Sequence, residues 1–130
     1  MAASSDIEEG STFAPKFGAD GLITCVAVDA ISGDVLMVAH MNSEALTRTL
    51  AEGRVWYFSR SRQSLWLKGE TSGQIQTLVE MRVDCDQDCI VVKVKVGGDG
   101  GACHTGRSRC FYRRVVNGPQ GPVLAFIDTP

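Results

Sequence analysis

Residues 90–96 read IVVKVKV, and the later valines of this stretch alternate with Lys93 and Lys95. An alternation of apolar and charged residues with a period of two is typical of a β-strand that has one face in the core and the other in water. Sheets with one wet face are commonly antiparallel. The stretch therefore predicts a fold built mostly on antiparallel β-strands.

More strands are expected on both sides of this one. Residues 22–29 and 35–41 are short runs rich in Val, Ile and Leu, and the residues SGD between them have the composition of a turn, which predicts a hairpin. Further strands are predicted in segments broken by Gly, Ser, Asn or Pro, namely residues 55–59, 65–68, 75–83, 110–116 and 123–127.

One segment has clear signals of a helix. Asn42 or Ser43 can cap a helix that has Glu44 in its first turn and ends at Gly53. The apolar residues between these limits fall on one face of such a helix. We therefore predict an α+β fold that is predominantly antiparallel β with one main helix.

The length and composition of the chain suit one domain. With 130 residues, of which 44% are apolar, the chain can form a core without covalent cross-links and has no room for a second domain. Residues 1–12 are rich in Ala, Ser and acidic residues and lack the basic start and apolar stretch of a signal peptide, so we interpret them as a flexible tail. Residues 13–130 then form the single domain of a cytoplasmic protein.

Charge and hydropathy exclude some partners. The chain has 13 Lys and Arg against 15 Asp and Glu, and the net charge of -2 gives no general attraction to nucleic acid or to an anionic membrane. The longest apolar runs fall far short of the length that crosses a bilayer. We expect no nucleic acid and no membrane among the partners, so any recognition of phosphate must be local.

The cysteines point to metal or catalysis rather than to disulfides. There are five, which is an odd number, and a reducing compartment disfavours disulfide bonds. Cys25 is the exception, because it lies inside the apolar run of residues 22–28. A cysteine in such a run usually behaves as a small buried hydrophobic residue.

A loop rich in Gly, Ser and Arg joins two predicted strands and carries Cys103, His104 and Cys110. Thiolates are ligands that zinc prefers, and Cys85 is a third candidate from a separate segment. Three protein ligands would leave one position of a tetrahedral zinc open, as catalytic sites do. The alternative is a closed structural site that adds Cys89, although its spacings lack the tight C-x2-C pairs of a zinc ribbon.

Asp84, Asp86 and Asp88 stand at every second position between two predicted strands. In an extended backbone alternate side chains share a face, so the three carboxylates are expected to converge while Cys85 points the other way. Oxygen ligands of this kind suit Mg2+ or Ca2+, although the segment does not match an EF-hand loop. The alternative is an acidic turn whose aspartates face water.

A polar stretch in the middle of the chain combines Arg60, Arg62 and Lys68 with Trp66 and several hydroxyl groups. Arginine grips phosphate with two hydrogen bonds, and glycines let backbone N–H groups approach it, so the stretch favours phosphate binding. A second group of arginines flanks the cysteine loop, namely Arg107, Arg109 and Arg113. Two such groups would suit a substrate with a phosphate at each end, whereas any single arginine can equally be a solvated surface charge.

Three motifs occur in a fixed order along the chain. They are WLKGETSG at residues 66–73, DCDQD at residues 84–88, and ACHTG at residues 102–106 followed by CFYR at residues 110–113. Each motif alone is of moderate specificity. The ordered set closely resembles the phosphoribosyl-AMP cyclohydrolase family of histidine biosynthesis, and the resemblance extends over residues 17–113.

The resemblance implies a hydrolase of cyclic amidines that opens the purine ring of phosphoribosyl-AMP at the N1–C6 bond to give the formimino-carboxamide ribonucleotide. It also implies an intertwined homodimer with one zinc per subunit, bound by Cys85 of one chain and by Cys103 and Cys110 of the other. Magnesium would be bound by Asp84, Asp86 and Asp88. We expect the substrate to contact a wider set of residues: Arg60, Arg62, Trp66, Lys68, Glu70, Thr71, Ser72 and Arg107.

The chemistry that follows is the addition of a zinc-activated water to C6 of the purine, as in the zinc deaminases of nucleobases. Three thiolates outweigh the charge of zinc, so a nearby base is useful. His104, beside a zinc ligand, is the candidate for this proton transfer, and a role as fourth zinc ligand is the alternative. We interpret His40 as structural, and a role in the pocket is the alternative.

Two other classes of protein share some of these sequence features. A non-enzymatic zinc module that binds a partner would have four protein ligands and no open coordination position. A Nudix-type pyrophosphatase is suggested by residues 33–38, but the long Glu-rich catalytic helix of that class is absent from the sequence.

Overall fold

The computed structural model describes residues 4–98 and 109–127 of the chain. Its elements, in chain order, are α1 (Ser4–Glu9), β1 (Ile23–Asp29), β2 (Val35–Met41), α2 (Ser43–Glu52), β3 (Trp56–Ser59), β4 (Ser64–Leu67), β5 (Gln76–Val83), β6 (Cys89–Val96), β7 (Arg113–Gly118) and β8 (Gly121–Phe126). The predicted main helix and the predicted strands are all present. The α+β class is therefore confirmed.

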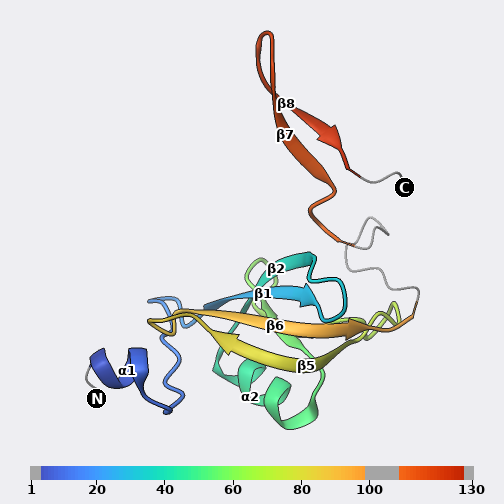
Figure 1. Ribbon diagram of the computed structural model, residues 1–130. Coiled ribbons are helices and arrows are strands. Elements are labelled where there is room, and N and C mark those ends of the chain that lie inside the picture. The colour runs from blue at the N-terminus through green and yellow to red at the C-terminus, as the bar shows by residue number, and fades with distance from the viewer. Residues whose placement is uncertain (1–3, 99–108, 128–130) are drawn as a thin grey trace.

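A four-stranded sheet in the order β2-β1-β6-β5 forms the centre of the domain (Figure 1). Alternation along β6 works as predicted, because Ile90, Val92 and Val94 are fully buried whereas Lys95 is exposed. The buried side chains of β1 and β2 complete this core together with residues from α2 and β3. Two further pairs, β3 with β4 and β7 with β8, are antiparallel hairpins.

The central sheet is mixed rather than wholly antiparallel. Within it, β1 pairs antiparallel with β2, and β5 pairs antiparallel with β6. The two hairpins join through β1 and β6, which run parallel, with Thr24 opposite Cys89 and Asp29 opposite Val94. Turn residues reveal each hairpin in the sequence, but nothing local specifies which strands of the two hairpins meet.

Helix α2 has the predicted caps. Asn42 adopts an extended backbone, and its Oδ1 accepts a hydrogen bond of 2.8 Å from the N–H of Ala45. At the other end Gly53 has a φ of 73°, in the left-handed region, and its N–H donates to the carbonyl of Thr49. These two caps fix the length of the helix.

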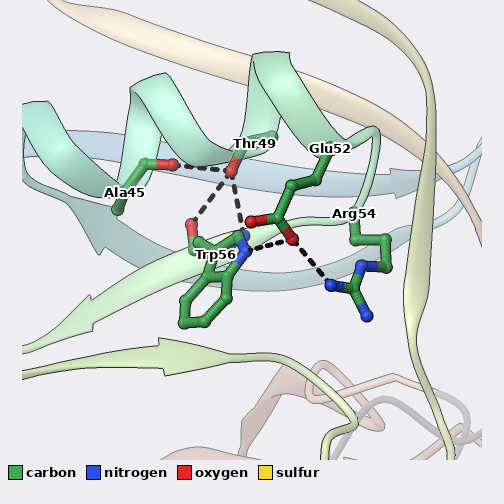
Figure 2. A network of polar contacts seen from close by, with 5 residues as sticks. All are labelled: Ala45, Thr49, Glu52, Arg54 and Trp56. Carbon is green, nitrogen blue, oxygen red and sulfur yellow. Dashed lines mark hydrogen bonds and ion pairs between the residues drawn. The ribbon is translucent and has the colours of Figure 1, made fainter.

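The end of α2 is attached to the start of β3 by the polar network in Figure 2. The Thr49 hydroxyl donates to the carbonyl of Ala45 at 2.8 Å and accepts from the backbone N–H of Trp56 at 2.9 Å. Glu52 accepts from the indole N–H of Trp56 at 3.0 Å and from Arg54 at 2.7 Å. The network fixes the start of β3, in which the side chain of Tyr57 is fully buried in the core.

The β7–β8 hairpin extends away from the central sheet (Figure 1). Its apolar side chains are largely exposed, with 69% of Val115, 54% of Leu124 and 63% of Phe126 open to solvent. A two-stranded hairpin is marginally stable by itself in water. Exposed apolar side chains that gather on one element mark a surface for another partner.

The N-terminal segment contains one element that was not predicted. Helix α1 lies within the residues that we interpret as a flexible tail. Backbone groups of Ile7, Thr12 and Ala14 form hydrogen bonds with the side-chain amide of Gln87, and the N–H of Lys16 donates to its backbone carbonyl. In residues 4–98 and 109–127, no helix is long and apolar enough to cross a membrane.

Candidate active site

The segment of residues 84–88 is a tight turn between β5 and β6. Gln87 donates its N–H to the carbonyl of Asp84 at 3.1 Å, and the Asp84 carboxylate accepts from the N–H groups of Asp88 and Cys89 at 2.9 and 3.1 Å. The carboxylate oxygens of Asp84, Asp86 and Asp88 lie within 4.8 Å of one another. The predicted convergence is present, but a turn causes it rather than an extended backbone.

Crowding of the carboxylates changes how they bind protons. A side-chain hydrogen bond with Asp84, followed by one with Asp86, raises the pKa of Asp88 to about 6. The same hydrogen bond to Asp88 lowers the pKa of Asp84. Three exposed carboxylates held this close favour either a shared proton or a cation, and their hard oxygen donors fit Mg2+.

The described zinc candidates are exposed thiols. Cys85 lies in the same turn as the aspartates. Cys110 lies where the chain returns to the sheet, and its N–H donates to the carbonyl of Leu36 at 2.7 Å. Arg109 reinforces this return through an ion pair of 2.8 Å with Asp34. The three other candidates of this loop, Cys103, His104 and Arg107, lie outside the described residues.

Cys85 and Cys110 lie at opposite ends of the central sheet. Cys85 lies just before Cys89, which is opposite Thr24 near the start of β1. The N–H of Cys110 bonds to Leu36, which is next to Val35, and Val35 is opposite Val28 near the end of β1. The four residue-to-residue steps from Thr24 to Val28 alone span roughly 13 Å of extended strand. The two thiols of one chain therefore cannot bind the same metal ion.

A polar hollow of about 290 Å³ lies at the Cys110 end of the sheet and contains most of the predicted substrate residues. Its lining includes Arg62, Trp66, Lys68, Glu70, Thr71 and Ser72. Lys68 is only 8% exposed, and its ammonium lies 5.7 Å from the centre of the Trp66 ring. No carboxylate is within ion-pair distance of Lys68 in the part of the chain that the structure describes. A buried ammonium in this state favours an anionic ligand.

The hollow lies next to the segment that leads toward Cys103. Gly69, with a φ of 88°, allows close contact within its loop, because a Cβ there would lie 2.2 Å from the backbone of Gln74 and Ile75. The N–H of Gly97 donates to the carbonyl of Ile75 at 2.9 Å. The segment with the predicted zinc ligands thus follows Gly97, beside the hollow, and leads to Cys110, whose N–H is bonded to the carbonyl of Leu36.

A second hollow, of about 520 Å³, is also lined by Trp66 and brings together Arg60, His40, Ser59 and Ser61. Partial burial, followed by the nearby charge of Arg60, lowers the pKa of His40. No local pattern in the sequence groups His40 with Arg60. The two meet only because β3 packs beside β2.

The cysteines differ in their expected reactivity. Cys25 is 0% exposed, as predicted, and burial raises the pKa of its thiol to about 12. Iodoacetamide at pH 8 should therefore leave Cys25 unmodified in the folded, metal-free protein and modify the exposed Cys85 and Cys110, as peptide mass spectrometry can measure. If the two exposed thiols bind zinc, added zinc should slow their modification. Modification of Cys25 as fast as Cys85 would contradict the described core.

The fold is that of a small α+β protein in which acidic and thiol groups accompany hollows lined by cations. The family model for phosphoribosyl-AMP cyclohydrolase matches residues 37–112. A phosphoribosyl-AMP cyclohydrolase of Bradyrhizobium diazoefficiens is 60% identical over 98% of this chain and 89% of its own length. One from Nitrobacter hamburgensis is 61% identical over 95% and 84% of the two chains. The chain belongs to the phosphoribosyl-AMP cyclohydrolase family.

Membership of this family confirms the resemblance and the prediction of an enzyme. The matched region includes both hollows, the acidic turn and Cys110. Neither a non-enzymatic zinc module nor a Nudix-type pyrophosphatase agrees with a match of this extent.

Proposed function

We propose that the protein catalyses the hydrolytic opening of the purine ring of phosphoribosyl-AMP at the N1–C6 bond, a step of histidine biosynthesis. The observation that carries the proposal is the sequence identity of about 60% to enzymes of that name over nearly the whole chain. Those relatives are covered over 84% to 89% of their own length. Similarity of this extent includes the fold and the candidate site together.

The zinc of the proposed enzyme is bound between two subunits, by Cys85 of one and by Cys103 and Cys110 of the other. The positions of Cys85 and Cys110 at opposite ends of the sheet support this sharing, since one chain holds only part of a ligand set at each end. Thiolate ligands fit zinc. When bound, zinc would supply Lewis-acid activation of water for attack on the purine.

A homodimer would also cover the β7–β8 hairpin. Its exposed apolar side chains favour a partner surface, and the hairpin begins at Arg113, three residues after Cys110. A second copy of this chain in a two-fold arrangement would provide that surface twice, once for each hairpin. Such an arrangement agrees with an intertwined dimer.

The remaining side chains take separate roles in the proposed reaction. Asp84, Asp86 and Asp88 would bind magnesium, which in turn would neutralise a phosphate of the substrate. His104 would move a proton at the purine, or else act as a fourth zinc ligand.

The two hollows, which share Trp66 in their lining, would bind the two ends of the substrate. Arg62 and Lys68 with Thr71 and Ser72 form one anion site, and Arg60 with Ser59 and Ser61 forms the other. The second anion site proposed here therefore differs from the second group of phosphate-binding arginines suggested by the sequence, namely Arg107, Arg109 and Arg113. Arg109 is engaged with Asp34, and Arg107 stays a candidate for substrate contact.

Replacement of Lys68 by methionine should weaken substrate binding. Loss of a buried cation that faces a phosphate should raise KM roughly tenfold or more, with a smaller effect on kcat. The matched control is Lys95→Met on an exposed position of β6, which should leave both constants unchanged. An unchanged KM in Lys68→Met would remove Lys68 from the substrate site.

The proposed activity is tested by turnover of phosphoribosyl-AMP. Purified protein loaded with zinc and magnesium should convert the substrate to the ring-opened product, as chromatography and the ultraviolet spectrum of the purine can follow. A chelator should stop turnover, and added zinc should restore it. Absence of ring opening in a zinc-loaded, folded sample would refute the proposal.

A further inference from the structure

Gln87 is the buried residue of the acidic turn. It is only 4% exposed, although the aspartates on both sides of it are exposed. Its φ of 59° lies in the left-handed region, which side chains other than glycine rarely adopt. A residue held in that conformation is constrained by its surroundings.

The constraint comes from the N-terminal segment. The Oε1 of Gln87 accepts a hydrogen bond of 2.7 Å from the N–H of Ala14, and its Nε2 donates to the carbonyls of Ile7 and Thr12 at 3.1 and 3.2 Å. The backbone carbonyl of Gln87 accepts from the N–H of Lys16 at 2.7 Å. Both amide N–H groups and the amide oxygen of one side chain are therefore used on a distant segment.

We infer that Gln87 is a positioning residue for the cation site and that residues 7–16 are the strap that holds it. The inference rests on the proposed binding of magnesium by the three aspartates. Gln87 lies between Asp86 and Asp88, so the position of its backbone determines where both aspartate side chains are attached. The base of the turn is held by the strands, through the Asp84 N–H on the Cys89 carbonyl, whereas its tip is held by the strap.

Preorganised ligands explain why such a strap affects function. A cation bound by three exposed carboxylates must overcome the mutual repulsion of Asp84, Asp86 and Asp88, whose oxygens lie within 4.8 Å of one another. If the tip of the turn moves freely, the carboxylates separate and binding must first bring them together again. Groups outside the ligand set that fix the orientation of ligands commonly change metal affinity ten- to a hundredfold.

The test is the affinity for Mg2+ of the zinc-loaded, full-length protein, measured by titration calorimetry well below the melting temperature. Gln87→Met keeps the length of the side chain and removes its hydrogen bonds, and we expect its Kd for Mg2+ to rise about tenfold or more. Ala14→Pro removes the N–H that donates to Gln87 and should act in the same direction. Ala14→Ser keeps that N–H and is the matched control. The double variant Gln87→Met with Ala14→Pro should have a Kd for Mg2+ no higher than that of Gln87→Met alone, because both changes remove the same contact.

The outcomes separate this inference from the proposed function. Wild-type Mg2+ affinity in both Gln87→Met and Ala14→Pro, even with a lower melting temperature, would make the strap a structural tether only and overturn the inference. If Gln87→Met fails to fold, Ala14→Pro against Ala14→Ser gives the decision. If Asp86→Asn leaves Mg2+ affinity unchanged, the cation site is not at these aspartates and the inference falls with it. Ring opening by the zinc-loaded wild type tests the proposed function independently.

Discussion

Substitution of Cys110 by serine should abolish both zinc binding and ring opening. Cys110 is exposed and fixed in place by its N–H bond to the Leu36 carbonyl, so the serine variant should keep the fold and lose only the thiolate. A site with three soft ligands that loses one should bind zinc at least about a hundredfold more weakly. Metal analysis of dialysed protein and turnover of phosphoribosyl-AMP measure the two effects.

Cys89→Ser is the matched control for this experiment. Cys89 is partly buried at the start of β6 and is not among the proposed ligands, so its replacement should leave zinc stoichiometry and turnover unchanged. Cobalt in place of zinc would report the number of thiolate ligands through its absorption spectrum. Equal loss of metal in Cys89→Ser would instead support the closed four-cysteine site. Full zinc content in Cys110→Ser would show that the ligand set is wrong.

The secondary structure was predictable because its signals are local. The alternation of valine and lysine in β6, the turn before β2 and the caps at Asn42 and Gly53 each depend on a few neighbouring residues, and each prediction is confirmed. The parallel pairing of β1 with β6 was not predictable in this way. Both strands are apolar on their inner faces, so packing of the whole sheet decides which edges meet.

The candidate site was only partly predictable for the same reason. The aspartates were found because their spacing is a local pattern, although Gln87 reverses the backbone that we expected to be extended. The grouping of His40 with Arg60, and of Gln87 with residues 7–16, depends on segments far apart in the chain. Motif resemblance supplied the chemical roles, which neither spacing nor burial can give.

Two inactive variants should restore activity to each other if zinc is shared between subunits. In a dimer of Cys85→Ser chains both sites lack Cys85, and in a dimer of Cys110→Ser chains both lack Cys110. A mixed dimer combines Cys85 of one chain with the intact cysteine loop of the other, so one of its two sites is complete. Random pairing makes half of the dimers mixed, and turnover should return to about a quarter of the wild-type value.

Coexpression of the two variants with different affinity tags allows the mixed dimer to be purified and assayed. Its zinc content should be about one ion per dimer, against two for the wild type. The control is a mixture of Cys110→Ser with Cys103→Ser, which lie in the same loop. Since both changes affect the same half of the site, no mixed dimer contains an intact set and turnover should stay absent. Recovery in that control, or no recovery with Cys85→Ser, would contradict a site divided between the two ends of the sheet.

Equilibrium sedimentation of the wild type, which should give a dimer, shows whether pairing occurs at all. The geometry of one chain makes this result a strong discriminator, because Cys85 and Cys110 are separated by the length of β1 and no rearrangement short of unfolding the sheet would join them.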